Sequence, residues 1–248
     1  MSDSKIYRDG DKLIKIYLSD PYEYVAQAYK KQKFAYDAGL PVPAVFGVKR
    51  INRTQTALEM EHIEGSPLIL RYEGKADEIQ AMRIMAKLQC QMHTIDASNS
   101  DLPCLITDYV NEIKKTPYLS GQIKEALLAL IKQLDNEKSS LCHGDMHPGN
   151  IIVNDKGSWI VDLESIAKGA PAADACMTYF YAKRWAADNQ NQSDELYLHI
   201  FCEESGIQSD EVLAWLPVIA GVQININDEN DRAFISNFLE KWYRSTSE

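Results

Sequence analysis

The stretch LCHGDMHPGNIIVNDKGSWIVDLES, residues 141–165, carries two histidines and three aspartates around two short apolar runs. The runs NIIV and WIVDL are joined through the turn Asn154-Asp155-Lys156-Gly157, a pattern that predicts a β-hairpin. Such a hairpin brings Asn150, at the start of its first strand, close to Asp162, at the end of its second. Polar side chains then gather at one end of the hairpin, where a metal site, a catalytic site and an overloaded turn are all possible.

The composition narrows the class of protein. The chain has 248 residues, of which 45% are hydrophobic and 25% charged, so it can bury an ordinary globular core. Its net charge of −10 disfavours nucleic acid and anionic membranes as partners. We expect no membrane span and no secretory signal, because no apolar run is long enough and the first residues are polar. Five scattered cysteines without a C-x-x-C motif favour reduced thiols in the cytoplasm.

The N-terminal part reads as a small β-rich unit. SKIYR and KLIKIY flank Asp9-Gly10 and predict a hairpin. A helix over residues 21–38 follows, and Gly39 ends it. AVFGVKRI and TALEMEHI then predict two further strands. We expect residues 1–62 to form an N-terminal lobe of one sheet and one helix.

The remainder, residues 63–248, reads as a mostly helical lobe. Apolar residues recur on one face of KADEIQAMRIMAKLQCQMHTI, and in SGQIKEALLALIKQL they recur at Ile123, Leu127, Leu130 and Leu134. After Pro171 we expect helices to the end in about four segments. The fold class is therefore α+β with two lobes, and the hairpin lies in the larger one.

The end of the hairpin suits phosphate chemistry. Asn150 and Asp162 offer the oxygen ligands that Mg²⁺ prefers, with room for water and substrate phosphates in the rest of its shell. Asp145, in the preceding loop, is then free to accept a proton from an attacking hydroxyl.

These motifs together resemble the aminoglycoside phosphotransferase and choline kinase branch of the protein-kinase-like superfamily. HGDMHPGN is similar to its H-G-D-x-H-x-x-N catalytic loop, and VDLE, with Asp162 twelve residues after Asn150, is similar to its metal motif. GLPVP, ALEMEHIEG and GAPAAD resemble less specific motifs of the same family. The resemblance implies a two-lobed fold and transfer of the ATP γ-phosphoryl group to a hydroxyl of a small molecule that is aminoglycoside-, choline- or sugar-like.

The resemblance also implies residue roles in catalysis and metal binding. Asp145 would be the catalytic carboxylate that orients or deprotonates the acceptor hydroxyl. Asn150 and Asp162 would hold Mg²⁺ at the ATP phosphates, with Glu164 supporting them. His143 and His147 would brace the loop.

Nucleotide binding falls to the N-terminal lobe in this comparison. Lys15 would contact the α- and β-phosphates, and the backbone from Glu61 to Ile63 would receive the adenine. Two departures matter. Only fourteen residues precede Lys15, so the lobe is truncated or the natural chain begins upstream. No glutamate stands at Gln27 or Ala28, where the family's helix offers a partner for the lysine.

Two rival interpretations follow. A catalytically weak or inactive nucleotide-binding pseudokinase would explain both departures, and a metal hydrolase would use His143 and His147. Other conspicuous residues have ordinary explanations. We expect His93 to be buried and hydrogen-bonded, Asp174 to brace the catalytic loop and Cys142 to be a small buried hydrophobe. The acceptor and the oligomeric state stay open.

Overall fold

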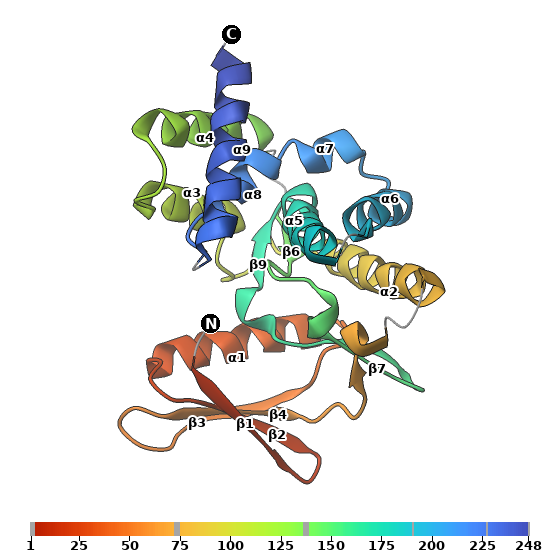
Figure 1. The fold of residues 1–248 in the computed structure, drawn as a ribbon. Coiled ribbons are helices and arrows are strands. Elements are labelled where there is room, and N and C mark those ends of the chain that lie inside the picture. Colours follow the sequence, from red (N-terminus) through yellow and green to blue (C-terminus); the bar gives the residue numbers. More distant parts are fainter. Residues whose placement is uncertain (1–2, 72–74, 136–138, 190, 227, 248) are drawn as a thin grey trace. The chain divides into compact units, whose positions relative to one another are not determined.

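The computed structural model describes residues 3–71, 75–135, 139–189, 191–226 and 228–247 (Figure 1). The chain packs as two compact units, each built from two segments. The first unit comprises residues 1–91 and 147–166, and the second comprises residues 92–146 and 167–248. The predicted hairpin therefore groups with the N-terminal sheet. The division into two domains after residue 62 stays a prediction.

A four-stranded antiparallel sheet forms the base of the first unit, in the order β1-β2-β4-β3. Its strands are β1 (Ser4–Asp9), β2 (Lys12–Tyr17), β3 (Val45–Arg50) and β4 (Thr56–Glu61). The turn between β1 and β2 holds Gly10 at a φ of 59°, a left-handed conformation that glycine adopts without steric cost. The predicted hairpin and both later strands are confirmed.

Helix α1 (Tyr22–Asp37) lies across one face of this sheet and contacts β3 and β4 (Figure 1). It ends as predicted, because Gly39 takes a left-handed φ of 84° just beyond it. The helix and the sheet bury a small apolar core between them, made of Tyr17, Val25, Ala28 and Leu58.

A second, smaller sheet of the first unit contains the hairpin. Its order is β5-β7-β8, from β5 (Ser66–Pro67), β7 (Ile151–Asn154) and β8 (Gly157–Ile160). Three short 3-10 helices, η1 (Leu68–Arg71), η2 (Pro148–Asn150) and η3 (Leu163–Ser165), lie at its margins, and α2 (Lys75–His93) begins in this unit. The second strand ends earlier than WIVDL suggested, because the backbone turns left-handed at Asp162 and enters η3.

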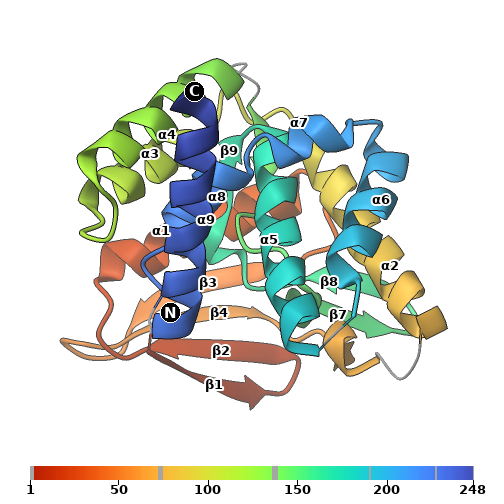
Figure 2. The same cartoon turned by 45° about the horizontal axis from the view of Figure 1, so that its top comes forward.

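The second unit is mostly helical around the short antiparallel pair β6 (Ser140–Cys142) and β9 (Ala167–Gly169). Its helices are α3 (Leu105–Lys115), α4 (Gly121–Leu134), α5 (Pro171–Asn189), α6 (Ser193–Ser205), α7 (Ser209–Leu213), α8 (Leu216–Gln223) and α9 (Glu229–Ser247). Figure 2 shows α3 and α4 on one side of α5, with α6 and α7 on the other. In α8, Gly221 allows close packing, since an added Cβ would lie 2.6 Å from the Leu127 side chain.

Three details of the second unit differ from the sequence predictions. The described chain after Pro171 forms five helices instead of four, because α7 is a separate short helix. Helix α3 was not predicted. In α4 the buried row is Ile123, Leu127 and Ile131, since Leu130 and Leu134 are only partly buried.

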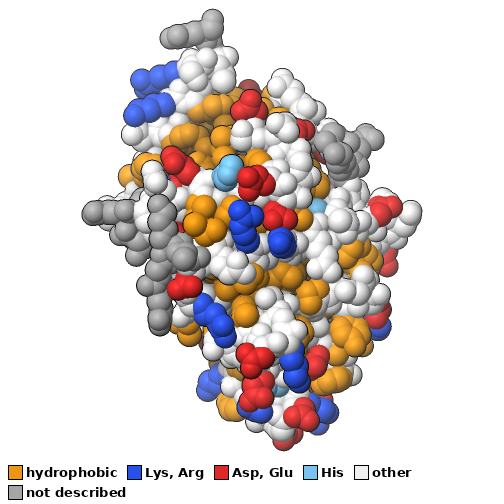
Figure 3. Space-filling model, turned by 90° about the vertical axis from the view of Figure 1, so that its right-hand side faces the viewer, with side chains coloured by type: hydrophobic (Ala, Val, Ile, Leu, Met, Phe, Trp, Pro, Cys, Tyr) orange, Lys and Arg blue, Asp and Glu red, His pale blue; other side chains and the backbone are white. Residues whose placement is uncertain are grey.

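The described helices include none that is both long and apolar enough to cross a membrane. On the face drawn in Figure 3, acidic and basic side chains alternate with apolar ones.

Candidate functional site

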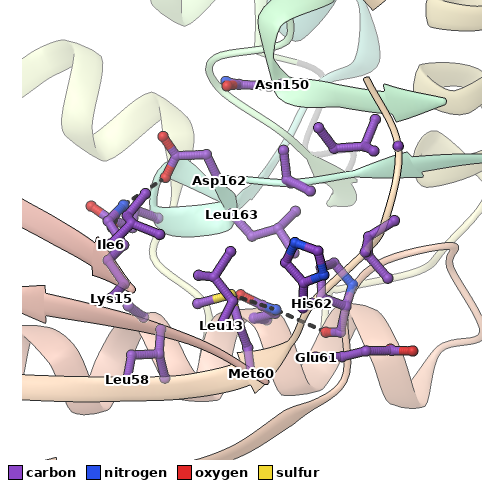
Figure 4. A pocket seen from close by; sticks show the side chains of 18 of the residues that line it. Ile6, Leu13, Lys15, Leu58, Met60, Glu61, His62, Asn150, Asp162 and Leu163 are labelled. Atoms are coloured by element: carbon purple, nitrogen blue, oxygen red, sulfur yellow. Dashed lines mark hydrogen bonds and ion pairs between the residues drawn. The ribbon is translucent and has the colours of Figure 1, made fainter. Parts of the chain in front are cut away.

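A cavity of about 390 Å³ lies within the first unit (Figure 4). Its middle is apolar, with Leu13 and Met60 from the large sheet and Leu163 from the segment after the hairpin. Lys15 and Asp162 lie together at one end, and the segment after β4 lies at the other. The cavity therefore offers an apolar slot with a charged group at one end.

The segment at the other end is residues 61–63, which line the cavity. Its first two backbone N–H groups are already used: Glu61 donates to the Ala44 carbonyl at 2.8 Å, and His62 donates to the Asp11 carbonyl at 2.9 Å. Among the described residues, the Ile63 N–H has no protein acceptor. A free backbone donor beside an apolar slot can fix the orientation of a flat heterocycle.

Lys15 lies at the charged end of the cavity and makes two ion pairs there. Its Nζ lies 2.5 Å from Glu164 Oε1 and 3.1 Å from Asp162 Oδ1. Burial opposes the charge on this lysine, but the hydrogen bond to Glu164 and the negative charges of Asp162 and Glu164 outweigh it and raise the lysine's pKa. The ammonium is therefore held charged at a fixed position.

Glu164 accepts several hydrogen bonds at the charged end of the cavity. Besides Lys15, it accepts hydrogen bonds from the hydroxyl of Tyr17 and, at 2.9 Å, from the hydroxyl of Tyr24. The Lys31 ammonium donates to its backbone carbonyl at 2.5 Å. Burial alone would raise the pKa of Glu164, yet the hydrogen bonds from Lys15 and Tyr17 lower it, so the group stays ionised.

Asp162 is the one described non-glycine residue with a positive φ (58°). That conformation is costly for most residues, although aspartate tolerates it better than most, and such strain concentrates at functional sites. Val161 N–H donates to the Asn150 carbonyl at 2.9 Å, which extends the hairpin ladder, and Asn150 and Asp162 both line the cavity.

The donor set fits Mg²⁺. Asn150 offers an amide oxygen and Asp162 a carboxylate, both hard ligands that line the same cavity. The Asp162 side chain is 47% exposed, which leaves space for water or phosphate oxygens.

The loop that carries Asp145 belongs to the second unit, where buried Asp174 holds it. Asp174 accepts backbone N–H groups from His143 at 3.2 Å and Gly144 at 2.7 Å, and lies 2.9 Å from His93 Nε2. The expected bracing by Asp174 is found, and His93 is hydrogen-bonded as expected, although as a residue it is only partly buried. His143 Nδ1 in turn accepts the Asp145 N–H at 3.2 Å.

Tyr181 of α5 was not singled out for this role by the sequence. Its hydroxyl donates a hydrogen bond to the Asp145 carboxylate. Burial, followed by the negative charge of Asp145, raises the pKa of Tyr181, so the phenol stays a neutral donor. Two contacts within the second unit therefore position Asp145: its backbone N–H donates to His143 of the same loop, and its carboxylate accepts from Tyr181 of α5.

The predicted site residues fall into two groups. Lys15, Glu61, Ile63, Asn150, Asp162 and Glu164 all line one cavity. Asp145 lies in the other unit. His147 accepts the Gly149 N–H through Nδ1 at 3.1 Å, which stabilises its own turn. Sequence reasoning missed Tyr17 and Tyr24; Tyr17 carried a signal, because it shares a strand face with Lys15 two residues earlier.

The metal-hydrolase interpretation gains no support from this geometry. Among the described residues, the one group with metal-ligand spacing is His93, Cys142 and Asp174. Both oxygens of Asp174 already accept hydrogen bonds, and burial raises the pKa of Cys142 well above its usual range. A protonated thiol is a poor zinc ligand.

Comparison with known proteins identifies the family. A model described as the phosphotransferase enzyme family matches residues 2–212. No curated protein matches. A solved structure of a thermostable mutant of aminoglycoside phosphotransferase APH(4)-Ia, in ternary complex with ADP and hygromycin B, has a TM-score of 0.70 and 14% identity over 100% of this chain and 95% of that one.

A second solved structure, aminoglycoside phosphotransferase APH(3'')-Id from Streptomyces rimosus, has a TM-score of 0.65 and 17% identity over 88% of this chain and 89% of that one. Identities this low show a shared fold alone. The fold is the expected α+β, protein-kinase-like one, and with the family model covering most of its length, the chain belongs to the phosphotransferase enzyme family.

Proposed function

We propose that the protein transfers the γ-phosphoryl group of ATP, with Mg²⁺, to a hydroxyl of a small molecule. The observation that carries the proposal is the single cavity in which an apolar slot, a charged lysine and two hard oxygen ligands converge. Its size falls within the range of small-molecule sites. Family membership as a phosphotransferase supports the same reaction.

ATP fits the two ends of the cavity. The adenine would lie in the apolar slot and accept the Ile63 N–H, and the phosphates would extend toward the Lys15 ammonium. Two related structures support a nucleotide here, since they hold ADP with hygromycin B and ADP with streptomycin. Asn150 and Asp162 would hold Mg²⁺, which when bound neutralises and orients the phosphate oxygens.

Asp145 would act on the acceptor. Its carboxylate, oriented by the Tyr181 hydroxyl and by the loop, would accept the proton of the attacking hydroxyl group. Because phosphoryl transfer depends mainly on positioning and charge neutralisation, a well-held base and a well-held lysine are the contributions the chain can make.

The alternative is a nucleotide-binding pseudokinase. Its motives were the short N-terminal segment before Lys15 and the missing helix glutamate. The ion pair between Lys15 and Glu164 answers the second motive and supports an active enzyme. The acceptor stays open between aminoglycoside-, choline- and sugar-like compounds, and the cytoplasmic location remains a prediction.

A thermal-shift titration with ATP and Mg²⁺ tests the proposal. At 100 times the dissociation constant, binding should add about 2.7 kcal/mol to the stability of the protein. For a chain of this size the unfolding temperature should rise by about 5–10 °C. The shift should need Mg²⁺ and should disappear in Asp162→Asn.

The matched control is Asp155→Asn, an exposed aspartate in the turn of the same hairpin, which should keep the full shift. No shift at millimolar ATP would refute nucleotide binding, and a metal-independent shift retained by Asp162→Asn would refute the metal role. If binding holds, release of ADP in the presence of candidate acceptors then identifies the hydroxyl compound.

A further inference from the structure

The partner of Lys15 is the feature of the cavity that the family resemblance does not predict. The helix position expected to carry a glutamate holds Ala28, which is buried, and the neighbouring Gln27 is exposed. We propose that Glu164 replaces the missing helix carboxylate: it is a positioning residue that holds the Lys15 ammonium toward the nucleotide phosphates, and it does not bind the metal. This inference rests on the proposed function, because it needs a nucleotide in the cavity.

The hydrogen bonds of Glu164 argue against metal binding. Oε1 receives the Lys15 ammonium and the Tyr17 hydroxyl, and Oε2 receives the Tyr24 hydroxyl. A cation at Glu164 would compete with these donors for the same lone pairs. Exposure separates the two acids of the motif as well, since the side chain of Glu164 is 18% exposed and that of Asp162 is 47% exposed.

Helix α1 has changed its role in parallel. Tyr24, Ala28 and Lys31 recur at i, i+4 and i+7, so they share one face of the helix. Tyr24 donates to the carboxylate of Glu164, and Lys31 donates to its backbone carbonyl. The helix therefore presents donors where a family helix would present an acceptor. A second carboxylate at Ala28 would bring like charge toward Glu164 in a half-buried place, which is unfavourable.

Asp162 and Glu164, the two acids of the motif, thus have different roles. Lys15 lies between them, closer to Glu164 (2.5 Å) than to Asp162 (3.1 Å). When a cation takes Asp162, Glu164 remains the partner of the lysine. The ammonium then keeps its position without an acid on α1.

A double-mutant cycle tests the inference. Glu164→Gln should lower kcat/KM for ATP by about 10- to 100-fold, the range for loss of a residue that orients a site group. In a Lys15→Met background the same change should have roughly a twofold effect or less, because residues that act through one another are not additive. ADP affinity, measured by calorimetry without an acceptor, should follow the same pattern and does not depend on turnover.

Magnesium dependence separates positioning from metal binding. At saturating ADP, the Mg²⁺ concentration for half-maximal stabilisation should be unchanged in Glu164→Gln and raised in Asp162→Asn.

Tyr24→Phe provides a second variant if Glu164→Gln fails to fold, because it removes one donor to Glu164 and keeps the carboxylate. It should also weaken ADP binding, by a smaller factor. Asp37→Asn is the matched control, because it removes an exposed carboxylate paired with Lys33 on the same helix, and it should change nothing.

Two results would overturn the inference while leaving the proposed function intact. Equal losses from Glu164→Gln with and without Lys15 would mean a purely structural role. A raised Mg²⁺ requirement with unchanged metal-free ADP affinity would make Glu164 a metal ligand. A wild-type protein that binds no nucleotide would instead overturn the proposed function and this inference together.

Discussion

Replacing Asp174 by alanine should destabilise the second unit and loosen the loop that carries Asp145. The side chain of Asp174 is 0% exposed and receives three donors, namely the backbone N–H groups of His143 and Gly144 and the Nε2 of His93. Removing the carboxylate would leave all three donors in a buried place without this acceptor.

The size of the effect follows from these contacts. Each hydrogen bond to a charged acceptor contributes about 1.5–3 kcal/mol, but bonds to one acceptor do not add. Removing one partner of a buried charged network typically costs about 3–5 kcal/mol. For a chain of this size Asp174→Ala should therefore lower the unfolding temperature by about 6–20 °C. Asp174→Asn, which keeps one acceptor oxygen, should cost about half as much.

Thermal unfolding followed by circular dichroism measures this change. Asp210→Asn, an exposed aspartate of the same unit, is the control and should leave the unfolding temperature nearly unchanged. The kcat of Asp174→Ala, measured below its melting transition, should fall while ADP binding in the first unit persists. An alanine variant that melts within about 2 °C of the wild type would refute the bracing role.

Three further outcomes are expected. Asp145→Ala should lower kcat by about 10²- to 10⁴-fold with ADP affinity unchanged, and full turnover in steady-state assays would exclude it as the base. Tyr181→Phe removes the hydroxyl donor to Asp145 and should lower kcat about tenfold, since a charge-assisted hydrogen bond contributes at least about 1.5 kcal/mol; an unchanged kcat would contradict this orientation. Gly65→Ala would place a Cβ 2.7 Å from the Val153 carbonyl oxygen, so we expect a loss of about 1–3 kcal/mol in urea unfolding, and an unchanged midpoint would show that the backbone yields freely.

The hairpin that carries Asn150 and Asp162 could be predicted from sequence because its geometry is local. Two short strands joined by a tight turn must pair in register, and Ile151 indeed pairs with Ile160. That register fixes where Asn150 and Asp162 come to lie. The left-handed backbone at Asp162 had no such signal, because aspartate usually adopts right-handed or extended conformations and only the packing selects this one.

The partner of Lys15 could not be predicted, because it lies 149 residues away in the sequence. The family resemblance indicated which positions of α1 should face the lysine, but it does not say which group they meet in this chain. A search for a carboxylate at Gln27 or Ala28 therefore found none and left the lysine unpaired. Tertiary packing supplied the acid from another element.

Short helices limited the prediction of the second unit. Helix α7 has five residues, too few for a periodic pattern to stand out, and Pro217 lies in the first turn of α8. Hence one expected helix became two.

The charges at the lysine end explain why the proposed nucleotide binding should need a metal. Lys15 pairs there with the carboxylates of Asp162 and Glu164, and Lys31 donates to the backbone carbonyl of Glu164. Two ammonium groups and two carboxylates therefore lie at this end, and their charges nearly balance. The chain as a whole is acidic, with a net charge of −10, and adds no compensating attraction. A triphosphate brings several further negative charges into a partly buried place, where unpaired charge is costly. Moving Glu164 away would reduce the negative charge at this end, but it would also remove a partner of Lys15. In the proposed function, a cation that arrives with the phosphates would therefore bind at the exposed carboxylate of Asp162 and at Asn150, which line the same cavity.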